Sequence, residues 1–351
     1  MERLLCVKIA SRGDLLLAGP AFRWLRGSRP GAHLALAVGR SCLEVARHLP
    51  WFDEVVAVDD AALLAGSWAQ KGRAARALRR LMREGASGAG APFDAVFLFH
   101  RDWRFALLAR LARISERRGF AAGGSRKFLT HAAEVEAREH HVLQYLRMAG
   151  AGSAADDRMM GGWRFLDGEQ ARAETRAAAS GFLCEKRSVA LAFGGGRNVK
   201  TRTELKSWPM EGWRDLSRAL VARGFQTVWM GDAEDAALLR GDEPGVHLAG
   251  KLDLAESAVV ASQAALVVSN DSFLLHLAEA LGVPAVGIFG PTDPAHYCPR
   301  SSRSRTLWAG EGLSCSPCHR DGWFPVCAHE HRCLRDLSAD AVLRACMEVL
   351  A

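Results

Sequence analysis

Two polar turns that follow apolar segments in the C-terminal half of the chain have residue types suited to binding an anion. The apolar segment 265–268 runs into Ser269-Asn270-Asp271-Ser272, residues that favour turns and helix N-caps. The pattern predicts a helix over 273–281 that ends at Gly282, then a second strand over 285–289 that ends at Gly290-Pro291-Thr292. Free amides at the start of such a helix attract negative charge, most simply a phosphate.

This strand–helix–strand unit also predicts where a ligand lies. In open α/β sheets, ligands bind beyond the carboxyl ends of parallel strands. We therefore expect the two turns to flank one crevice. The candidate ligand-binding residues in them are Asp271, Ser272, His276 and Thr292.

An aspartate follows the first apolar segment of the chain in the same way. Residues 4–10 predict a strand, Ser11-Arg12-Gly13-Asp14 forms a turn, and a helical pattern with Gly19-Pro20 inside it continues to Leu25. A carboxylate at this position can serve as a general base or can cap the helix. The residues alone leave both roles open for Asp14.

Three consecutive glycines and a lysine form a further candidate phosphate site. Gly194-Gly195-Gly196 follow a predicted strand over 188–193, and Lys206 precedes a helix predicted over 211–222. Glycine allows the backbone to approach a diphosphate, and a lysine near a helix start would neutralise it. Gly195, Gly196 and Lys206 are therefore candidates for holding a phosphorylated ligand.

The net charge of +7 is concentrated in the N-terminal half. A helix predicted over 68–84 carries arginines at helical spacing on one face, and two more arginines lie where a strand ends at His100 and the next helix begins. Such a surface suits phosphates or anionic headgroups, and a merely solvated face is the alternative. The arginines that we expect to contact an anionic partner are Arg73, Arg76, Arg80, Arg101 and Arg104.

Four of the nine cysteines are clustered in a C-x2-C-x8-C-x5-C pattern. Four thiols in a short loop suit a structural zinc or iron ion, and packed, reduced thiols are the alternative. The cysteines concerned are Cys315, Cys318, Cys327 and Cys333.

The chain of 351 residues is long enough for two domains. Strand and helix patterns alternate in both halves, which predicts an α/β fold. The last helix predicted in the first half covers residues 131–148. We expect a first domain over 1–160, and a second over 161–351 that includes the cysteine-rich loop 315–333 and a terminal helix. No apolar run reaches the ~20 residues that a membrane span needs, and no apolar leader follows Met1, so we expect a cytoplasmic location.

Taken together, these motifs resemble glycosyltransferase family 9, the ADP-heptose:lipopolysaccharide heptosyltransferases. The matching motifs are G-D at Asp14, K-x-W-P at Lys206, D-S-x-x-x-H-L-A from Asp271, and F-G-P-T-D-P from Phe289. Phe273 departs from the family, which usually has glycine at that position, and its ring would narrow the sugar pocket.

The resemblance implies a GT-B architecture, in which two Rossmann-like domains face a central cleft. The implied reaction moves a heptose or related sugar from an ADP-sugar to an acceptor hydroxyl with inversion. Asp14 would be the base in the acceptor-binding N-terminal domain. In the nucleotide-binding C-terminal domain, Lys206 would bind the phosphates and Glu234 the ribose, with Asp232 as the alternative to Glu234.

The resemblance further implies that no catalytic metal is needed and that the acceptor is an anionic glycolipid of the lipopolysaccharide core or another glycan. The enzyme could then touch the inner membrane surface. A protein or a secondary metabolite as acceptor, and a GT-B-like nucleotide-sugar epimerase, are the alternatives. We expect no nucleic-acid partner, because the basic half lacks aromatic platforms for bases.

Overall fold

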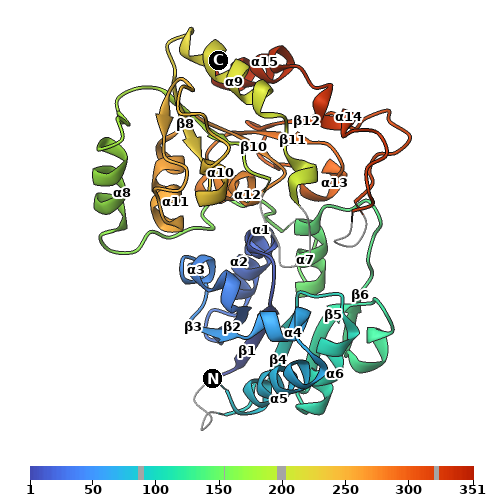
Figure 1. Ribbon diagram of the computed structural model, residues 1–351. Coiled ribbons are helices and arrows are strands. Elements are labelled where there is room, and N and C mark those ends of the chain that lie inside the picture. The colour runs from blue at the N-terminus through green and yellow to red at the C-terminus, as the bar shows by residue number, and fades with distance from the viewer. Residues whose placement is uncertain (86–90, 154, 196–202, 320–323) are drawn as a thin grey trace. The chain divides into compact units, whose positions relative to one another are not determined.

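The structure is a computed structural model that describes residues 1–85, 91–153, 155–195, 203–319 and 324–351. The chain divides into two compact units, Met1–Arg158 and Met159–Ala351, which Figure 1 colours from blue to green and from green to red. Each unit is built around one parallel β-sheet.

In the described part of the N-terminal unit, the sheet has six strands in the order β3-β2-β1-β4-β5-β6. The strands are β1 (Arg3–Lys8), β2 (His33–Gly39), β3 (Glu54–Val58), β4 (Ala95–Leu98), β5 (Glu116–Phe120) and β6 (His131–Ala133). The helices are α1 (Arg12–Leu17), α2 (Gly19–Ser28), α3 (Leu43–Arg47), α4 (Asp60–Ala65), α5 (Trp68–Glu84), α6 (Trp103–Leu111) and α7 (His141–Ala149), with 3₁₀ turns at Arg40–Cys42 and Ser125–Phe128.

The C-terminal unit repeats this topology, and its described strands are ordered β12-β11-β10-β7-β8-β9. They are β7 (Ser188–Ala192), β8 (Gln226–Met230), β9 (Val246–His247), β10 (Leu266–Asn270), β11 (Ala285–Phe289) and β12 (Arg305–Trp308). The helices are α8 (Glu169–Ala178), α9 (Met210–Val221), α10 (Ala233–Ala236), α11 (Leu254–Gln263), α12 (Phe273–Leu281), α13 (Pro294–Tyr297), α14 (Arg332–Arg335) and α15 (Ala339–Leu350), with a 3₁₀ turn at Thr203–Lys206.

Both sheets have the Rossmann strand order, in which the first and fourth strands of the unit are neighbours. The chain therefore leaves β1 toward one edge of its sheet and β4 toward the other, and β7 and β10 have the same relationship. Ligands of doubly wound folds bind beyond the carboxyl ends of the strands at such a switch point. The residues that follow β1, β4, β7 and β10 are therefore the positions to search for a site.

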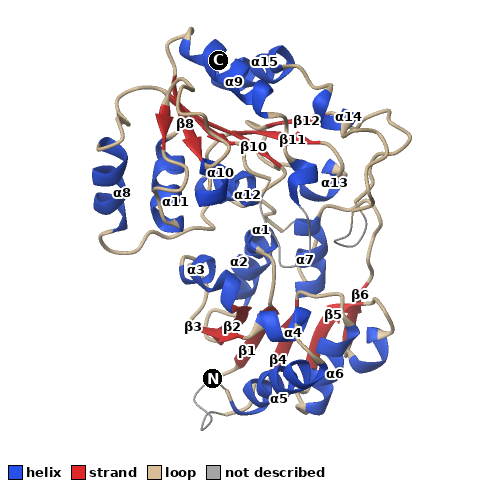
Figure 2. Ribbon diagram, viewed as in Figure 1, coloured by secondary structure: helices blue, strands red, loops and turns tan. Residues whose placement is uncertain are grey.

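The C-terminal sheet is buried on both faces by helices, as Figure 2 shows. Leu191, Val268 and Ile288 enter one core with residues of α9 and α15, whereas Ala190 and Val267 enter a second core with residues of α11 and α12. Strands buried on both faces have nearly continuous apolar sequences. This burial explains why the sequence predicted β7, β10 and β11.

The predicted α/β fold with two Rossmann-like sheets is confirmed. The predicted end of α12 is also confirmed, because Gly282 takes the left-handed conformation there, with φ of 76°. None of the helices in the described ranges is long and apolar enough to cross a membrane.

Two local predictions were wrong. A helix was expected over 131–148, but His131–Ala133 form β6, which pairs with β5, and the helix begins only at His141. His140 is its N-cap, because its Nδ1 accepts a hydrogen bond from the amide of Val142 at 3.2 Å. The helical pattern after Asp14 is also not one helix, since it divides into α1 and α2 before Pro20.

Candidate active site

Asp14 lies beyond the carboxyl end of β1, at the switch point of the N-terminal sheet. Asp14 is in the first turn of α1. The N-cap residue of that helix is Ser11 and not Asp14. The Nζ atom of Lys8, the last residue of β1, lies 3.1 Å from Oδ2 of Asp14. The Lys8 side chain is only 3% exposed, whereas that of Asp14 is 30% exposed. The buried ammonium group of Lys8 is therefore paired with the partly exposed carboxylate of Asp14.

His100, which follows β4, completes this switch point. Its Nε2 accepts a hydrogen bond from the amide of Ile9 at 2.6 Å, so that nitrogen carries no proton. Burial and the nearby charge of Lys8 hold the pKa of His100 well below its ordinary value, against the opposite effect of Asp14. His100 is therefore a neutral imidazole beside the Lys8–Asp14 pair.

Arg101 is a predicted acceptor residue whose charge, like that of Asp14, acts on Tyr145. Its Nη2 donates a hydrogen bond to Oε1 of Gln144 in α7 at 2.8 Å, and its guanidinium lies 5.9 Å from the centre of the Phe120 ring. Burial raises the pKa of Tyr145 well above its ordinary value; the charge of Asp14 raises it further and that of Arg101 lowers it. Both charges thus act on the same neutral phenol.

The other predicted acceptor arginines do not join this cluster. Arg104 forms an ion pair with Asp102 at 2.9 Å, and Arg80 forms one with Glu84 at 2.7 Å. Arg73 and Arg76 are exposed on α5, whose buried face packs on the sheet core. Figure 1 places α5 at the opposite end of this unit from α1. The arginines of α5 thus form a separate basic surface.

In the C-terminal unit, Lys206 and Asp271 form a buried ion pair. Nζ of Lys206 lies 2.5 Å from Oδ2 of Asp271, and Oγ1 of Thr292 donates to the same oxygen at 2.8 Å. Burial by itself would raise the pKa of Asp271, but the charge of Lys206 and the hydrogen bonds hold it below its ordinary value. Lys206 and Thr292, both predicted as donor ligands, therefore contact the predicted ligand Asp271, and the lysine and the aspartate carry opposite charges.

Asn270, the last residue of β10, ties the segments of this site together. Its Oδ1 accepts from the amide of Trp208 at 3.0 Å. Its Nδ2 donates to the carbonyl oxygens of Phe193 at 2.8 Å and Gly194 at 3.2 Å. One fully buried carboxamide thus joins the K-x-W-P segment, the end of β7 and the glycine turn.

The glycine turn lies beside α10. A Cβ atom on Gly194 would lie 2.3 Å from Oδ2 of Asp235, so only glycine fits there. Gly195 follows in the described chain, whereas Gly196 lies outside the described residues. Asp232 caps α10 by accepting hydrogen bonds from the amides of Glu234 and Asp235, each at 2.9 Å. Asp232 therefore has a structural role, and Glu234 is exposed on the first turn of α10.

The remaining predicted donor residues lie at the start of α12. Ser272 is its N-cap residue, and the Oγ atoms of Ser272 and Ser269 are 3.0 Å apart. His276 is buried in the following turn, where its charge would act on Asp271. Phe273 is the first helical residue and is half-buried. The amides of the first turn of α12 thus lie next to the Lys206–Asp271 pair.

The four clustered cysteines lie close enough to influence one another. Burial, and after it repulsion from the thiolates of Cys318, Cys327 and Cys315, raises the pKa of Cys333 to about 11. The amide of His331 donates to Sγ of Cys327 at 3.3 Å. Within the described ranges, however, no three Cys, His, Asp or Glu side chains are arranged to hold a metal ion. Residues 320–323, between Cys318 and Cys327, lie outside those ranges.

Sequence reasoning missed the buried partners of the candidate residues. Lys8 had a usable signal, because it is the one charged residue in the apolar run 4–10. Asn270 was identified only as a turn residue, and Gln144 and Tyr145 had no local signal. Their roles depend on contacts between segments far apart in the chain.

Known proteins resemble this chain along most of its length. Lipopolysaccharide heptosyltransferase 2 of Salmonella typhimurium is 24% identical over 311 residues, which is 84% of each chain. The crystal structure of a family 9 glycosyltransferase from Veillonella parvula matches with a TM-score of 0.79 at 19% identity, over 99% of this chain and 97% of that one. The E. coli ADP-heptose lipopolysaccharide heptosyltransferase II matches with a TM-score of 0.71 at 20% identity, over 100% and 98%.

A further structural match has a lower TM-score. A dodecameric glycosyltransferase of enterotoxigenic E. coli, described as iron-containing, matches with a TM-score of 0.59 at 16% identity, over 99% of this chain and 76% of that one. These likenesses show the GT-B fold. The sequence model of glycosyltransferase family 9 (heptosyltransferase) matches residues 83–323, more than half of the chain. The chain therefore belongs to glycosyltransferase family 9 and is a glycosyltransferase.

Proposed function

We propose that this glycosyltransferase moves a heptose from ADP-heptose to an acceptor hydroxyl of the lipopolysaccharide core, with inversion at the anomeric carbon and with Asp14 as general base. The observation that carries the proposal is the Lys8–Asp14 pair at the switch point of the N-terminal sheet. The names of the family and of its Salmonella relative supply the substrate class.

The base is required because a sugar hydroxyl is a weak nucleophile at neutral pH. A carboxylate within hydrogen-bond reach takes the hydroxyl proton as the anomeric bond breaks. Lys8 favours the ionised carboxylate, since an adjacent cation stabilises negative charge, most strongly when the cation is buried. A carboxylate can accept about four hydrogen bonds, so the bond from Lys8 leaves capacity for a substrate hydroxyl.

The diphosphate would bind in the C-terminal unit. Lys206 and the first-turn amides of α12 would stabilise the charge that develops on the ADP leaving group. Gly195 would allow the backbone close to the phosphates, and Glu234 would bind the ribose. The sugar would lie near Asp271, Ser272, His276 and Thr292. In this scheme protein groups stabilise the phosphate charge, and no catalytic metal is assigned a step.

The acceptor would be anionic. Arg101 lies in the same cluster as Asp14 and would contact an acid or phosphate group near the reacting hydroxyl. Arg104 and the arginines of α5 would contact groups farther along the acceptor. A panel of phosphorylated core, peptide and small-molecule acceptors, analysed by mass spectrometry, would identify the acceptor class. It would also distinguish sugar transfer from epimerisation, which yields no larger product.

The substitution Asp14→Asn tests the base directly. It preserves the shape of the side chain, and we expect kcat to fall roughly 10²- to 10⁴-fold, the usual size of an acid–base contribution, while ADP affinity and melting temperature stay near wild type. Asp59→Asn is the matched control, because Asp59 caps α4 by accepting from the amide of Ala62 at 2.9 Å. The control should retain wild-type kcat. Normal turnover by Asp14→Asn would refute the assignment.

The second part of the proposal is a structural metal ion at Cys315, Cys318, Cys327 and Cys333. Its support is the proximity of the four thiols, whose mutual repulsion a cation would relieve. The described residues show no metal geometry, so we assign no catalytic step to the ion. Elemental analysis of protein purified without a metal-affinity tag should find about one zinc or iron per chain. Absence of both metals, with all four thiols freely alkylated in the native protein, would refute this part.

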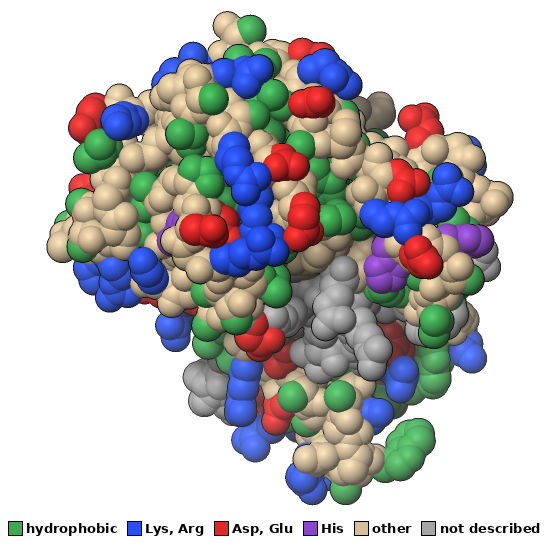
Figure 3. All heavy atoms as spheres, turned by 45° about the horizontal axis from the view of Figure 1, so that its top comes forward, with side chains coloured by type: hydrophobic (Ala, Val, Ile, Leu, Met, Phe, Trp, Pro, Cys, Tyr) green, Lys and Arg blue, Asp and Glu red, His purple; other side chains and the backbone are tan. Residues whose placement is uncertain are grey.

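The third part is peripheral contact between α5 and an anionic membrane. Trp68, at the start of α5, is 88% exposed, and Arg73, Arg76 and Arg80 are exposed on the same helix. Tryptophan favours the membrane interface, and each cation near an anionic surface contributes about 1 kcal/mol. Basic and acidic side chains lie beside one another on the face drawn in Figure 3.

Co-sedimentation with phosphatidylglycerol vesicles tests this contact. Replacing the three α5 arginines by glutamine should reduce binding more than 10-fold at low salt. In the control variant, glutamine replaces three arginines of the C-terminal unit, and this variant should bind the vesicles as wild type does. The arginines replaced are Arg218, Arg223 and Arg240. Equal binding by the two triple variants would refute membrane docking through α5.

A further inference from the structure

The loop that carries the cysteines is attached to the donor site by three hydrogen bonds. The carbonyl oxygen of Gly290, which also accepts from Nε1 of Trp308 in β12 at 3.2 Å, accepts from Oγ of Ser316 at 3.0 Å. The carbonyl oxygen of Pro291 accepts from the amides of Cys318 and His319, each at 3.0 Å. Gly290 and Pro291 directly precede Thr292, which hydrogen-bonds Asp271. The cysteine loop thus supports the turn that holds the Lys206–Asp271 pair.

The packing here leaves no space for intervening side chains. A Cβ atom on Gly290 would lie 2.5 Å from Cγ of Leu334, which follows the last clustered cysteine. A Cβ atom on Gly310 would lie 2.4 Å from the carbonyl oxygen of Gly290. Real Cβ atoms do not approach other atoms so closely. The turn after β11 is therefore packed tightly against the residues on either side of the cysteine loop.

Phe324 extends this contact to the lysine itself. The Nζ atom of Lys206 lies 5.8 Å from the centre of the Phe324 ring, within the range of a cation–π interaction. The Phe324 ring in turn packs on His319, with ring centres 4.6 Å apart. His319 is the residue whose amide donates to Pro291. A continuous chain of contacts therefore runs from the turn after β11, through the cysteine loop, to the ammonium group of Lys206.

We propose that residues 315–319 and 324–333 of the cysteine loop form one wall of the donor-phosphate site, and that Phe324 is the positioning residue that holds the Lys206 ammonium toward the diphosphate. The inference rests on the proposed function, because it takes Lys206 as the phosphate-binding cation. Asp271 and Phe324 together restrict a long, flexible side chain that would otherwise sample many rotamers. A lysine held in place before the ligand arrives binds phosphate more tightly than a freely moving one.

Substitutions at Phe324 test the positioning role. Phe324→Leu keeps an apolar side chain but removes the π face, and we expect ADP to bind roughly 3- to 10-fold more weakly in calorimetry, with adenosine affinity unchanged. Phe324→Tyr should restore ADP affinity, because it keeps the ring. A role in stability alone would weaken ADP and adenosine binding equally, and that outcome would overturn the proposal.

A matched control exists in the same unit. The guanidinium of Arg187 lies 5.5 Å from the centre of the Phe225 ring. Phe225→Leu removes the same kind of pair away from the donor residues and should leave ADP affinity at the wild-type value. An equal loss in Phe225→Leu and Phe324→Leu would show a general packing effect and would overturn the proposal.

Hydrogen exchange in the wild-type protein tests whether the cysteine loop lies against the donor-phosphate site. This measurement does not depend on how the variants fold. Because coupling between two sites is reciprocal, ADP that uses Lys206 should slow amide exchange in the peptide that contains Cys318 and His319. Phe324→Leu should show less of this protection. Unchanged exchange in that peptide at saturating ADP would overturn the inference.

Substitutions at Lys206 and Phe324 distinguish an error in the phosphate site from an error in the role of the cysteine loop. If Lys206→Met leaves ADP affinity unchanged, the proposed phosphate site is wrong. If Lys206→Met weakens ADP binding but Phe324→Leu does not, Lys206 keeps its role and the inference about the cysteine loop is wrong.

Discussion

Lys206 and Asp271 are 2.5 Å apart in the C-terminal unit, and their side chains are only 16% and 5% exposed. The lysine that would bind phosphate is thus also the counter-ion of a buried carboxylate. Removing one member of a buried pair leaves an uncompensated charge, which costs about 3–5 kcal/mol, whereas removing both can be nearly neutral. A substitution at Lys206 can therefore lower the stability of the protein as well as its affinity for phosphate.

We therefore expect Lys206→Met to lower the free energy of unfolding of the C-terminal unit by about 3 kcal/mol, because Asp271 loses its counter-ion. The double variant Lys206→Met/Asp271→Asn should recover most of that loss, since no charge remains buried. Urea titration of the single and double variants measures both effects. Additive losses in the double variant would show that the two residues are not energetically coupled. ADP affinities should be compared only where each variant is folded.

Lys8 is expected to act through Asp14. Lys8→Met removes the buried cation beside the carboxylate, so protonation of Asp14 becomes easier and the acid limb of the kcat/KM profile should move to higher pH. Several groups act on this cluster: His100 and Arg101 after β4, and Tyr145 in α7. Arg12 and Asp60, which together with Lys8 influence the thiol of Cys42, lie on the other side of β1.

The pH range of the effect at Lys8 follows from the ordinary pKa of aspartate, about 3.9. We expect the loss in activity to be largest at the acid end of the profile, below about pH 5, and small at pH 8, where the carboxylate ionises without help. Lys8→Arg should restore part of the profile, because it retains the charge. A loss of activity that is the same at every pH would indicate a role in packing only.

Local sequence patterns predicted the elements that are buried and therefore have a recognisable apolar sequence. β7, β10 and β11 are buried on both faces, so their sequences are continuous apolar runs. The edge strand β6 was predicted as helix and β12 was not predicted, because each lies at a sheet edge and has polar residues. Their pairing depends on the neighbouring strand and not on an apolar period.

At the candidate site, too, local sequence patterns predicted some residues and not others. Motif residues such as Asp14, Lys206 and Asp271 could be identified from type and spacing. Their partners could not, because the hydrogen bonds of Asn270 join residues 62 and 77 positions away in the chain. Phe324 likewise reaches Lys206 only through the fold. Contacts between distant segments follow from topology, which local periodicity does not encode.

Substitution of Asn270 tests whether these hydrogen bonds between distant segments matter for phosphate binding. Asn270→Leu removes hydrogen bonds to Trp208, Phe193 and Gly194, so the glycine turn and the K-x-W-P segment lose their shared anchor. We expect ADP affinity to fall roughly 10-fold and adenosine affinity to stay near wild type. Ser217→Ala is the control, because Ser217 is equally buried and hydrogen-bonds Pro244. Equal losses of ADP and adenosine affinity in Asn270→Leu would contradict a specific effect on phosphate binding.

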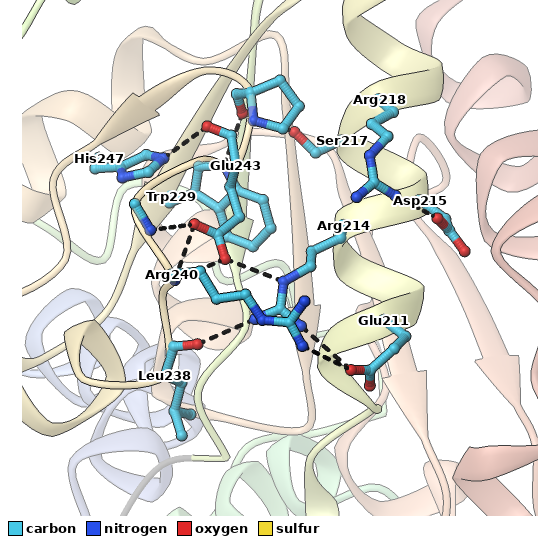
Figure 4. A network of polar contacts seen from close by, with 12 residues as sticks. Glu211, Arg214, Asp215, Ser217, Arg218, Trp229, Leu238, Arg240, Glu243 and His247 are labelled. Carbon is cyan, nitrogen blue, oxygen red and sulfur yellow. Dashed lines mark hydrogen bonds and ion pairs between the residues drawn. The ribbon is translucent and has the colours of Figure 1, made fainter.

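A buried carboxylate in the C-terminal unit predicts how the stability of that unit depends on pH. Glu243 accepts from Nε of Arg214 at 3.0 Å and from the amides of Arg240 and Gly241, each at 2.9 Å, in the network of Figure 4. Burial by itself would raise the pKa of Glu243, but these hydrogen bonds lower it from the ordinary value of 4.5 to about 2. A pKa that is lower in the folded state means that ionisation favours folding.

The stabilisation from Glu243 should be fully present above about pH 4.5 and be lost as the pH falls toward 2. The difference in pKa corresponds to about 3 kcal/mol at neutral pH. Glu243→Gln should therefore unfold at lower urea concentration than wild type at pH 7, and the difference between the two proteins should shrink as the pH falls toward 2. Glu211→Gln is the control, because Glu211 pairs with the same Arg214 but its side chain is 73% exposed, so it should change stability by less than about 1 kcal/mol. A difference between wild type and Glu243→Gln that is the same at pH 7 and pH 3 would show that the ionised carboxylate does not stabilise the fold.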